Sequence, residues 1–280
     1  SSAASPPING DLPRKFASRD ALNSLLAQEF PGAEGELSPI RGGLEAAEDK
    51  LRRIDPRRYA KSRNHLKGAV TGLSPYIRHG VLTLAEVRDS VFARIRNRDE
   101  GGKLINELGW RDFWHRMWLD LGDGIHDDQE PFKTGHDAGA YIRELPADVR
   151  AGSTGLACMD GFRDQLVTTG WLHNHARMWM AAWLVHWRLV HWKAGADWFL
   201  EHLLDGDPAS NHLSWQWVAS TFSHKPYFFN RGNLERYSDG HYCDSCPSAN
   251  SCPFEGSYDQ LENQLFAPMP AIRDLSLIHI

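Results

Sequence analysis

Apolar residues recur at steps of three and four along most of this chain, which is the spacing of an amphipathic α-helix. In the clearest example, 74–98, Pro75 suits a first helical turn and five apolar residues follow at these steps: Val81, Leu84, Val87, Val91 and Ile95. No segment alternates convincingly between apolar and polar residues beside hairpin signals. The chain is therefore predicted to be all-α.

The remaining helices are expected at 19–30, 42–54, 104–121, 171–192 and 198–204, with a further helix starting at Pro208. Residues 1–13 combine Ser, Pro and Gly with almost nothing to bury, so we expect a mobile arm there. A single helical domain is predicted over 14–265, and residues 266–280 are left as a tail.

The 280 residues are 41% hydrophobic and 24% charged, which is enough to bury a core and excludes a disordered chain. The net charge is −5, so any surface for nucleic acid has to be local; the densest positive stretch, 50–67, holds eight Lys or Arg against one Asp. No signal peptide, apolar span or disulfide scaffold is recognisable. A soluble, cytoplasmic monomer with no membrane contact is expected.

Glu107, Trp110 and Arg111 stand at i, i+3 and i+4, which on a helix places a carboxylate, an indole and a guanidinium on one face. The trio fits a ligand site, although taken alone an ion pair beside a core Trp is the more common arrangement. In the expected helix 171–192, Asn174 and Met178 lie one turn apart, and Arg177 beside them requires an anion. A row at four-residue steps on that helix is typical of core packing: His175, Trp179, Trp183, Trp187 and His191.

The segment 205–220 opens with two acids that flank a glycine before a helix-starting proline: Asp205, Gly206, Asp207 and Pro208. Trp215 lies one turn after Asn211, whereas Trp217 is rotated by about 200° from Trp215 on a helix. Asn211 and Trp215 can then face a buried ligand while Trp217 faces a cleft. A helix N-cap followed by packing indoles is the alternative.

Three cysteines fall within ten residues, Cys243 and Cys246 as CxxC and then Cys252, and Cys158 lies upstream in GLACMDGF. Such a set indicates a metal site. Zinc and an iron–sulfur cluster both accept four thiolates, and the spacing does not choose between them. Buried thiols without a metal are the remaining interpretation.

Four segments, in this order, resemble the FAD-binding domain of the photolyase and cryptochrome family, specifically of class I cyclobutane pyrimidine dimer photolyases. They are GLSPYIRHGVL (72–82), NELGWRDFW (106–114), TGWLHNHARM (169–178) and DGDPASNHLSWQWVAS (205–220). The likeness runs from about 42 to 220 and implies a helical domain with FAD bent into its cavity. The family's N-terminal α/β antenna domain is expected to be absent.

The resemblance assigns FAD contacts to Tyr59, Thr71, Gly72, Leu73, Ser74, Arg111, Asn174, Arg177, Asp205, Gly206, Asp207 and Asn211. The stretch 71–74 would hold the phosphates, Arg177 would pair with Asp205, and Asn211 would lie near flavin N5. Electron transfer to the flavin is assigned to Trp215 and Trp192, with Tyr141 in place of the family's usual surface Trp. Leu104 and His175 depart from the family pattern, and His175 would make DNA binding sensitive to pH.

The lesion pocket implied by the resemblance uses Glu107 to hydrogen-bond the damaged pyrimidine, Trp110 and Trp217 as walls and Met178 below, with Asn174 nearby. The implied activity is blue-light-driven electron transfer from reduced FAD to cyclobutane pyrimidine dimers in DNA, with single strands as a compatible preference. Related (6-4) enzymes place histidine in this helix, so Asn174 and Met178 favour cyclobutane dimers. His173 and His175 nevertheless keep the (6-4) lesion open.

The thiols resemble those of the iron–sulfur bacterial cryptochromes and photolyases, which implies a 4Fe-4S cluster, with zinc as the alternative, on Cys158, Cys243, Cys246 and Cys252 in and before the region 243–252. Two rival functions remain. A cryptochrome-like photoreceptor without repair is disfavoured by the intact pocket residues. A helical nucleic-acid-binding protein without photochemistry is disfavoured by the segment 205–217.

Overall fold

The computed structural model describes residues 13–30, 32 and 36–266. The expected arm, apart from Pro13, and the expected tail, apart from Phe266, lie outside these residues. The described part of the chain contains helices and no named strand; the one isolated bridge there pairs Ile142 with Val190. The all-α prediction is confirmed. No helix in this part of the chain has the length and apolar character needed to cross a bilayer.

The chain divides into two compact units, 1–41 and 42–280. The first holds α1, Arg19–Glu29, which begins where the Ser18 side chain accepts a hydrogen bond from the Ala21 N–H. Helix α1 buries no residue, and the Arg19 guanidinium donates to the Ser38 carbonyl oxygen at 3.1 Å. The expected boundary at residue 14 stays a prediction.

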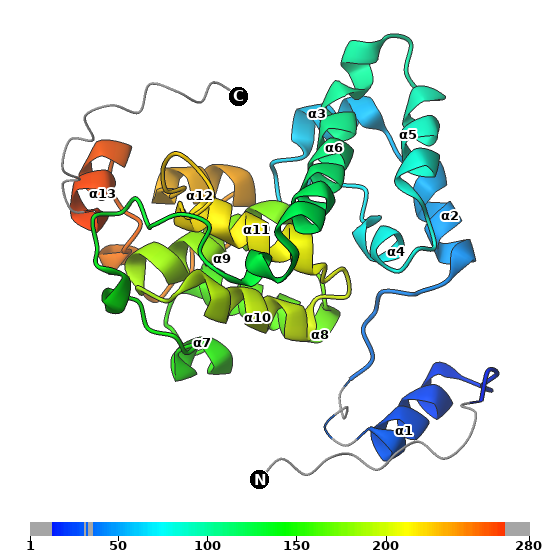
Figure 1. The fold of residues 1–280 in the computed structure, drawn as a ribbon, viewed down its shortest axis with the longest axis horizontal. Coiled ribbons are helices and arrows are strands. Elements are labelled where there is room, and N and C mark those ends of the chain that lie inside the picture. Colours follow the sequence, from blue (N-terminus) through cyan, green and yellow to red (C-terminus); the bar gives the residue numbers. More distant parts are fainter. Residues whose placement is uncertain (1–12, 31, 33–35, 267–280) are drawn as a thin grey trace. The chain divides into compact units, whose positions relative to one another are not determined.

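The first half of the second unit surrounds a cluster of buried apolar side chains that includes Ala47, Tyr76 and Val87. Figure 1 shows its helices grouped beside the long helix α6. They are α2 (Leu44–Arg52), α3 (Pro56–Ser62), α4 (Ser74–Arg78), α5 (Leu84–Phe92) and α6 (Arg98–Leu121).

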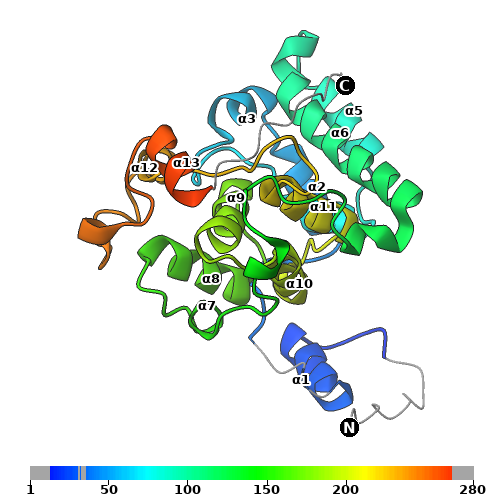
Figure 2. The same ribbon diagram turned by 60° about the vertical axis from the view of Figure 1, so that its left-hand side comes forward.

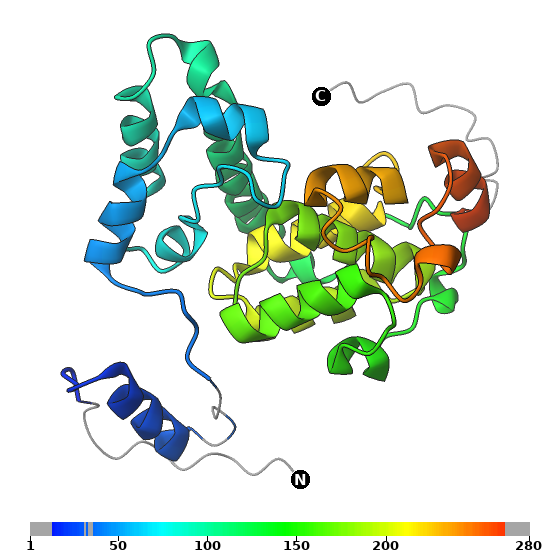
Figure 3. The same ribbon diagram turned by 180° about the vertical axis from the view of Figure 1, so that it is seen from behind.

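The second half packs around a larger core rich in indoles, in which Trp179, Trp192 and Trp198 are fully buried. Helices α8 to α11 lie side by side there (Figures 2 and 3), and α11 also contacts α6. The elements are η1 (Gly122–His126), η2 (Ala138–Ala140), α7 (Ala147–Ala151), α8 (Ala157–Thr169), α9 (Asn174–Ala182), η3 (Trp183–Trp187), α10 (Trp192–His202), α11 (Pro208–Ala219), α12 (Arg231–Ser238), η4 (Ala249–Ser251) and α13 (Tyr258–Leu265).

The helix expected over 74–98 is wrong as a single element. It breaks after α4 at Gly80, whose φ of +70° lies in the left-handed region that only glycine adopts readily. Helix α5 then restarts behind a capping box, in which the Thr83 hydroxyl accepts from the Glu86 N–H and the Glu86 carboxylate accepts from the Thr83 N–H. A turn therefore separates two short amphipathic helices.

The helix expected over 171–192 is also interrupted. Helix α9 begins at Asn174, runs into the π-helical turn η3 and ends before Leu189, which has a φ of +47°. Helix α10 then starts at Trp192 and absorbs most of the segment expected as a separate helix, 198–204. A π turn shifts the side chains around the helix axis, so the four-residue aromatic row does not form one straight stripe.

Gly195 allows α10 and α11 to approach closely, because a Cβ there would overlap the indole ring of Trp215. We expect Gly195→Ala to lower the free energy of unfolding by about 1–3 kcal/mol, since the rigid ring cannot yield easily. Gly102→Ala in α6 is the matched control: outside the backbone of its own helix turn, no atom lies within 4 Å of where the new Cβ would be, and the change should raise stability by up to about 1 kcal/mol. Urea denaturation measures both, and equal midpoints for the two variants would contradict the prediction.

Candidate functional site

A cavity of about 410 Å³ lies among α6, α9, α10 and α11, within the range of roughly 300–1,000 Å³ typical of small-molecule sites. We call it the main cavity. Its inner residues are buried, as with Phe199 at 1% exposure, whereas Trp110 and Trp217 at its mouth are 50% and 38% exposed. The space therefore combines an enclosed inner part with an aromatic opening.

Asp205 and Arg177 form an ion pair in the inner part of this cavity. The Arg177 guanidinium donates to one carboxylate oxygen of Asp205, Oδ2, at 2.8 Å and to the Leu172 carbonyl at 2.9 Å. The Asp205 side chain is only 3% exposed, and its second oxygen, Oδ1, is buried without a hydrogen-bond partner among the described residues. Buried polar atoms are rarely left unpaired, so Oδ1 indicates a donor on a bound ligand.

Asp207 begins α11 and lines the main cavity as well. Its Oδ2 accepts from the Ser210 N–H at 2.8 Å, and the side chains of His115 and Arg111 lie 3.1 and 4.0 Å from its oxygens. Burial raises the pKa of Asp207, but the Ser210 hydrogen bonds and the charges of Arg111 and His115 outweigh it and lower the pKa. Asp207 is thus both a helix N-cap and a fixed negative charge.

Asn211 and the two indoles of α11 occupy different depths of the cavity. The Asn211 amide nitrogen donates to the Ala196 carbonyl at 2.8 Å, which fixes the orientation of the side chain. Trp215 is 3% exposed and stands edge-on to Phe199, whereas Trp217 is exposed and lies beside Tyr227. One helix thereby presents a half-buried amide and a buried indole together with an open indole.

The mouth of the cavity holds Glu107, which forms an ion pair with Arg63. Trp110 is stacked against Trp114 with ring centroids 5.5 Å apart, and the Asn174 amide donates to the Met178 sulfur at 3.3 Å. Sequence reasoning missed Arg63. It lies in the basic stretch 50–67, where the sequence does not distinguish it from the other cations. Only the packing of α3 against α6 brings Arg63, and not its neighbours, to Glu107.

Some residues assigned to FAD do not line the main cavity. The Arg63 guanidinium lies over the Tyr59 ring, with its carbon 5.9 Å from the ring centroid. Burial, together with the charge of Glu107, raises the pKa of Tyr59. The stretch 71–74 precedes α4; Leu73 is buried in the other core, and Gly72 lies close to the Lys50 ammonium. Gly206, in contrast, lines the main cavity. Arg111 does not line it but lies 4.0 Å from Asp207, which does.

The residues assigned to electron transfer are buried. Trp192 is fully enclosed, and its indole N–H donates to Asp128 at 2.5 Å. Tyr141 was expected to replace a surface Trp, but it is 3% exposed, stacks on Phe132 and shares a hydrogen bond of 2.6 Å with Thr134. A surface position for Tyr141 is therefore wrong.

His175 does not provide the pH sensitivity expected near neutrality. Burial, followed by the nearby charges of His173 and Arg63, lowers its pKa to about 4. The ring is therefore neutral at pH 7 and adds no positive charge for a phosphate.

The four cysteines line a second, smaller cavity, although they come from distant parts of the chain: Cys158, Cys243, Cys246 and Cys252. Cys158 lies on α8 and the others follow α12. Burial raises the pKa of the Cys243 thiol to about 11. In the described residues, no three His, Cys, Asp or Glu side chains are placed closely enough to hold a metal ion. The thiols converge without forming a closed single-ion site.

Comparison with known proteins gives one family match, the FAD-binding domain of DNA photolyase, over residues 104–244. Two curated proteins named deoxyribodipyrimidine photo-lyase are similar: that of Streptomyces griseus, 36% identical over 58% of this chain, and that of Halobacterium salinarum, 31% identical over 79%. The chain spans 35% and 48% of their lengths. The crystal structure of a class III photolyase from Agrobacterium tumefaciens, 26% identical, aligns with a TM-score of 0.61 over 79% of this chain and 49% of that one.

Removing the cation beside Asp205 tests the inner part of the cavity. We expect Arg177→Met to lower the free energy of unfolding by about 3 kcal/mol or more, because an uncompensated carboxylate stays buried. In the control Arg150→Met the partner Glu201 is 52% exposed, so the cost should stay below about 1 kcal/mol. Urea denaturation at neutral pH measures the difference, and equal losses in both variants would show that Asp205 is solvated.

Proposed function

The chain belongs to the family of the FAD-binding domain of DNA photolyase, and from this premise we propose that it repairs cyclobutane pyrimidine dimers in DNA with FAD and blue light. One observation carries the proposal: a single cavity joins a buried ionic and amide-lined interior to an exposed mouth of aromatic side chains and a carboxylate, Glu107. The interior suits a flavin, and the mouth suits a base turned out of a duplex.

The interior fits FAD by the chemistry of its side chains. The unpaired Asp205 oxygen accepts a hydrogen bond, Arg177 and Arg111 supply positive charge, and Asn211 offers an amide oxygen. We propose these residues, with Asn174, Gly206 and Asp207, as the flavin contacts. Tyr59 and the stretch 71–74, next to Lys50, are proposed for the rest of the cofactor. When bound, reduced FAD supplies a light-excited one-electron donor.

The residues at the mouth are proposed to bind the lesion. Trp110 and Trp217 offer apolar faces, and aromatic stacking contributes about 1–3 kcal/mol per base in single-strand recognition. Glu107 hydrogen-bonds the damaged pyrimidine, and Arg63 holds its carboxylate in place until then. Met178 and Asn174 complete the pocket. These side chains orient the lesion and exclude water; none acts as a nucleophile.

Damaged DNA is the proposed partner, and the basic stretch 50–67 is its proposed phosphate contact. Several of its cations are well exposed, among them Arg52, Arg53 and Arg57. The whole chain carries a net charge of −5, so the affinity should fall steeply with salt. A preference for single strands belongs to this proposal.

Trp215 and Trp192 are proposed to pass electrons to the flavin, with Tyr141 as a buried donor beyond them. Trp192 adjoins His191, whose ring faces Phe132, and Phe132 stacks on Tyr141 with centroids 4.1 Å apart. Contacting rings therefore connect Trp192 with Tyr141. This series of ring contacts supports an electron route that ends at the buried Tyr141 and not at a surface Trp.

The four cysteines are proposed to hold a 4Fe-4S cluster, with zinc as the alternative. Their convergence on one cavity and the cluster's demand for four thiolates support this proposal. Burial raises the pKa values of Cys158 and Cys252, so the free thiols stay protonated and deprotonation requires the metal.

Glu107→Ala tests the lesion pocket. Repair yield under blue light should fall about tenfold while FAD stays bound, because a hydrogen bond to a charged group contributes about 1.5–3 kcal/mol. The assay measures recovered thymine absorbance in a thymine-dimer oligonucleotide with chemically reduced protein. The control is Asp112→Ala on the same helix, whose carboxylate pairs with the exposed Arg116; its repair should match that of the unmodified protein.

Other outcomes of that assay oppose the proposal in different ways. Loss of FAD from Glu107→Ala would place this side chain in the flavin site. A yellow protein that repairs nothing would support the cryptochrome-like photoreceptor instead. A colourless protein after reconstitution with FAD would exclude both functions.

Iron and acid-labile sulfide analysis tests the thiols. Purified protein should contain both in equal amounts, and Cys243→Ser should lose both because the cluster needs all four thiolates. Ser251→Ala, within the cysteine region but not a thiol, is the control and should keep them. Zinc without sulfide, or no metal at all, contradicts the cluster.

A further inference from the structure

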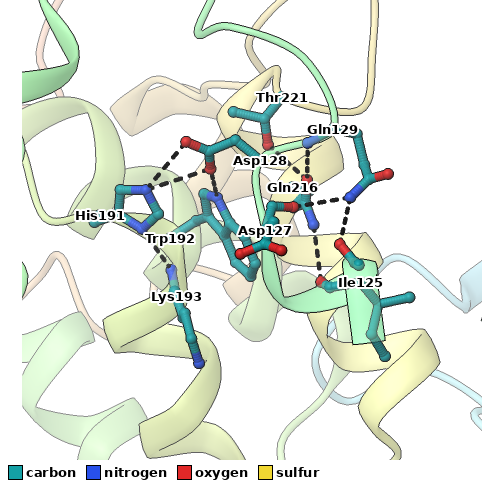
Figure 4. A network of polar contacts seen from close by, with 10 residues as sticks. Ile125, Asp127, Asp128, Gln129, His191, Trp192, Lys193, Gln216 and Thr221 are labelled. Atoms are coloured by element: carbon teal, nitrogen blue, oxygen red, sulfur yellow. Dashed lines mark hydrogen bonds and ion pairs between the residues drawn. The ribbon is translucent and has the colours of Figure 1, made fainter. Parts of the chain in front are cut away.

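The buried indole of Trp192 is hydrogen-bonded to a carboxylate that reaches water. Figure 4 shows Asp128 between Trp192 and His191. The Trp192 side chain is fully buried, whereas that of Asp128 is 33% exposed, and the indole N–H donates to its Oδ1 at 2.5 Å. Asp128 therefore connects an enclosed N–H group with solvent.

The loop that carries Asp128 is fixed by a second set of hydrogen bonds (Figure 4). Gln216 of α11 is fully buried, accepts from the Gln129 N–H at 3.1 Å and donates to the Ile125 carbonyl at 3.0 Å. The Thr221 hydroxyl donates to the same Gln216 oxygen at 3.1 Å, and the Glu130 N–H donates to the Thr221 carbonyl. Backbone bonds on both sides of Asp128 thus position its carboxylate.

Asp128 is ionised at neutral pH. Burial by itself would raise the pKa of Asp128, but hydrogen bonds from His191 and Trp192 outweigh it and hold the pKa below the usual range. The carboxylate is therefore available as a proton acceptor.

His191 cannot take that role, because its own hydrogen bonds define its tautomer. Its Nδ1 accepts from the Lys193 N–H at 3.2 Å and so carries no proton. The proton of the neutral ring is then on Nε2, which faces the Asp128 oxygens at 3.3 and 3.4 Å. His191 therefore donates to Asp128 and cannot accept a proton from Trp192. Among the described residues, Asp128 is the acceptor hydrogen-bonded to the indole N–H.

We propose that Asp128 accepts the indole proton of Trp192 when Trp192 loses an electron. The inference rests on the electron route of the proposed function. In this step Trp192 is oxidised by one electron, which passes through Trp215 to oxidised flavin, the one-electron oxidant. The indole N–H bond breaks, an O–H bond forms on Asp128, and the proton leaves to water from the exposed side of that carboxylate.

The proton transfer keeps the separated charges apart. Loss of an electron places a positive charge on the ring and makes its N–H a strong acid. Once the proton has left, the remaining neutral radical attracts the returning electron less strongly. Asp128 thereby acts as a positioning and proton-accepting residue for Trp192 without touching the flavin site.

Asp128→Asn tests this role, because the amide oxygen still accepts the indole hydrogen bond but is a far weaker base. After a blue flash on protein with oxidised FAD, transient absorption should show a deprotonated tryptophan radical in the unmodified protein. In Asp128→Asn the protonated radical should persist about a hundredfold longer or more, the scale of general-base effects. Asp127→Asn, with the same charge change on the same loop, should behave as the unmodified protein.

Three results would overturn the inference. By transient absorption, they are a tryptophan radical that deprotonates equally fast in Asp128→Asn and the unmodified protein, and a radical signal that Trp192→Phe leaves unchanged. By NMR of flavin-free protein, it is a Trp192 indole N–H resonance that Asp128→Asn does not shift. Because the resonance is measured on flavin-free protein, it tests the hydrogen bond between Trp192 and Asp128 even if no flavin binds. Repair by chemically reduced protein needs no electron from Trp192. A failed repair assay therefore rejects the proposed function separately, while intact repair with any of these three results rejects only the role of Asp128.

Discussion

Two buried carboxylates two positions apart, Asp205 and Asp207, organise the site just before α11. An isolated buried carboxylate is costly, so each needs a cation or hydrogen-bond donors within reach. Arg177 comes to Asp205 from α9, and Arg111 and His115 come to Asp207 from α6. Charge pairing therefore ties helices distant in sequence to one helix terminus, and the main cavity lies where they meet.

The aromatic residues divide by depth around this charged interior. Trp179, Trp192 and Trp198 fill the core, whereas Trp110 and Trp217 remain at the mouth. Stacked, edge-on or tilted neighbours hold the rings at the mouth, so little conformational freedom is left for the proposed base to remove on binding. The large number of indoles thus has two physical explanations: packing of a helical core and a rigid apolar opening.

Periodicity predicted the helical class, because it depends on local spacing alone. The pair of Asp205 and Arg177 spans 28 positions and was predicted only through the family resemblance. The periodicity failed at Gly80 and Leu189, where one residue with positive φ ends a helix while the apolar repeat continues across the break. Arg63 and Asp128 escaped notice because their partners, Glu107 and Trp192, lie 44 and 64 positions away. Contacts over such distances arise from tertiary packing and leave no signature in a single sequence.

The close approach of Trp215 to Gly195 has a consequence for charge movement through α11. The ring lies against the backbone of α10 and edge-on to Phe199, so on these two sides it is surrounded by packed protein atoms. A protein interior packed this densely rearranges little when a group within it changes charge. In the electron route that we propose, the absence of a side chain at Gly195 therefore lowers the reorganisation energy of Trp215, because it lets the ring pack directly against α10.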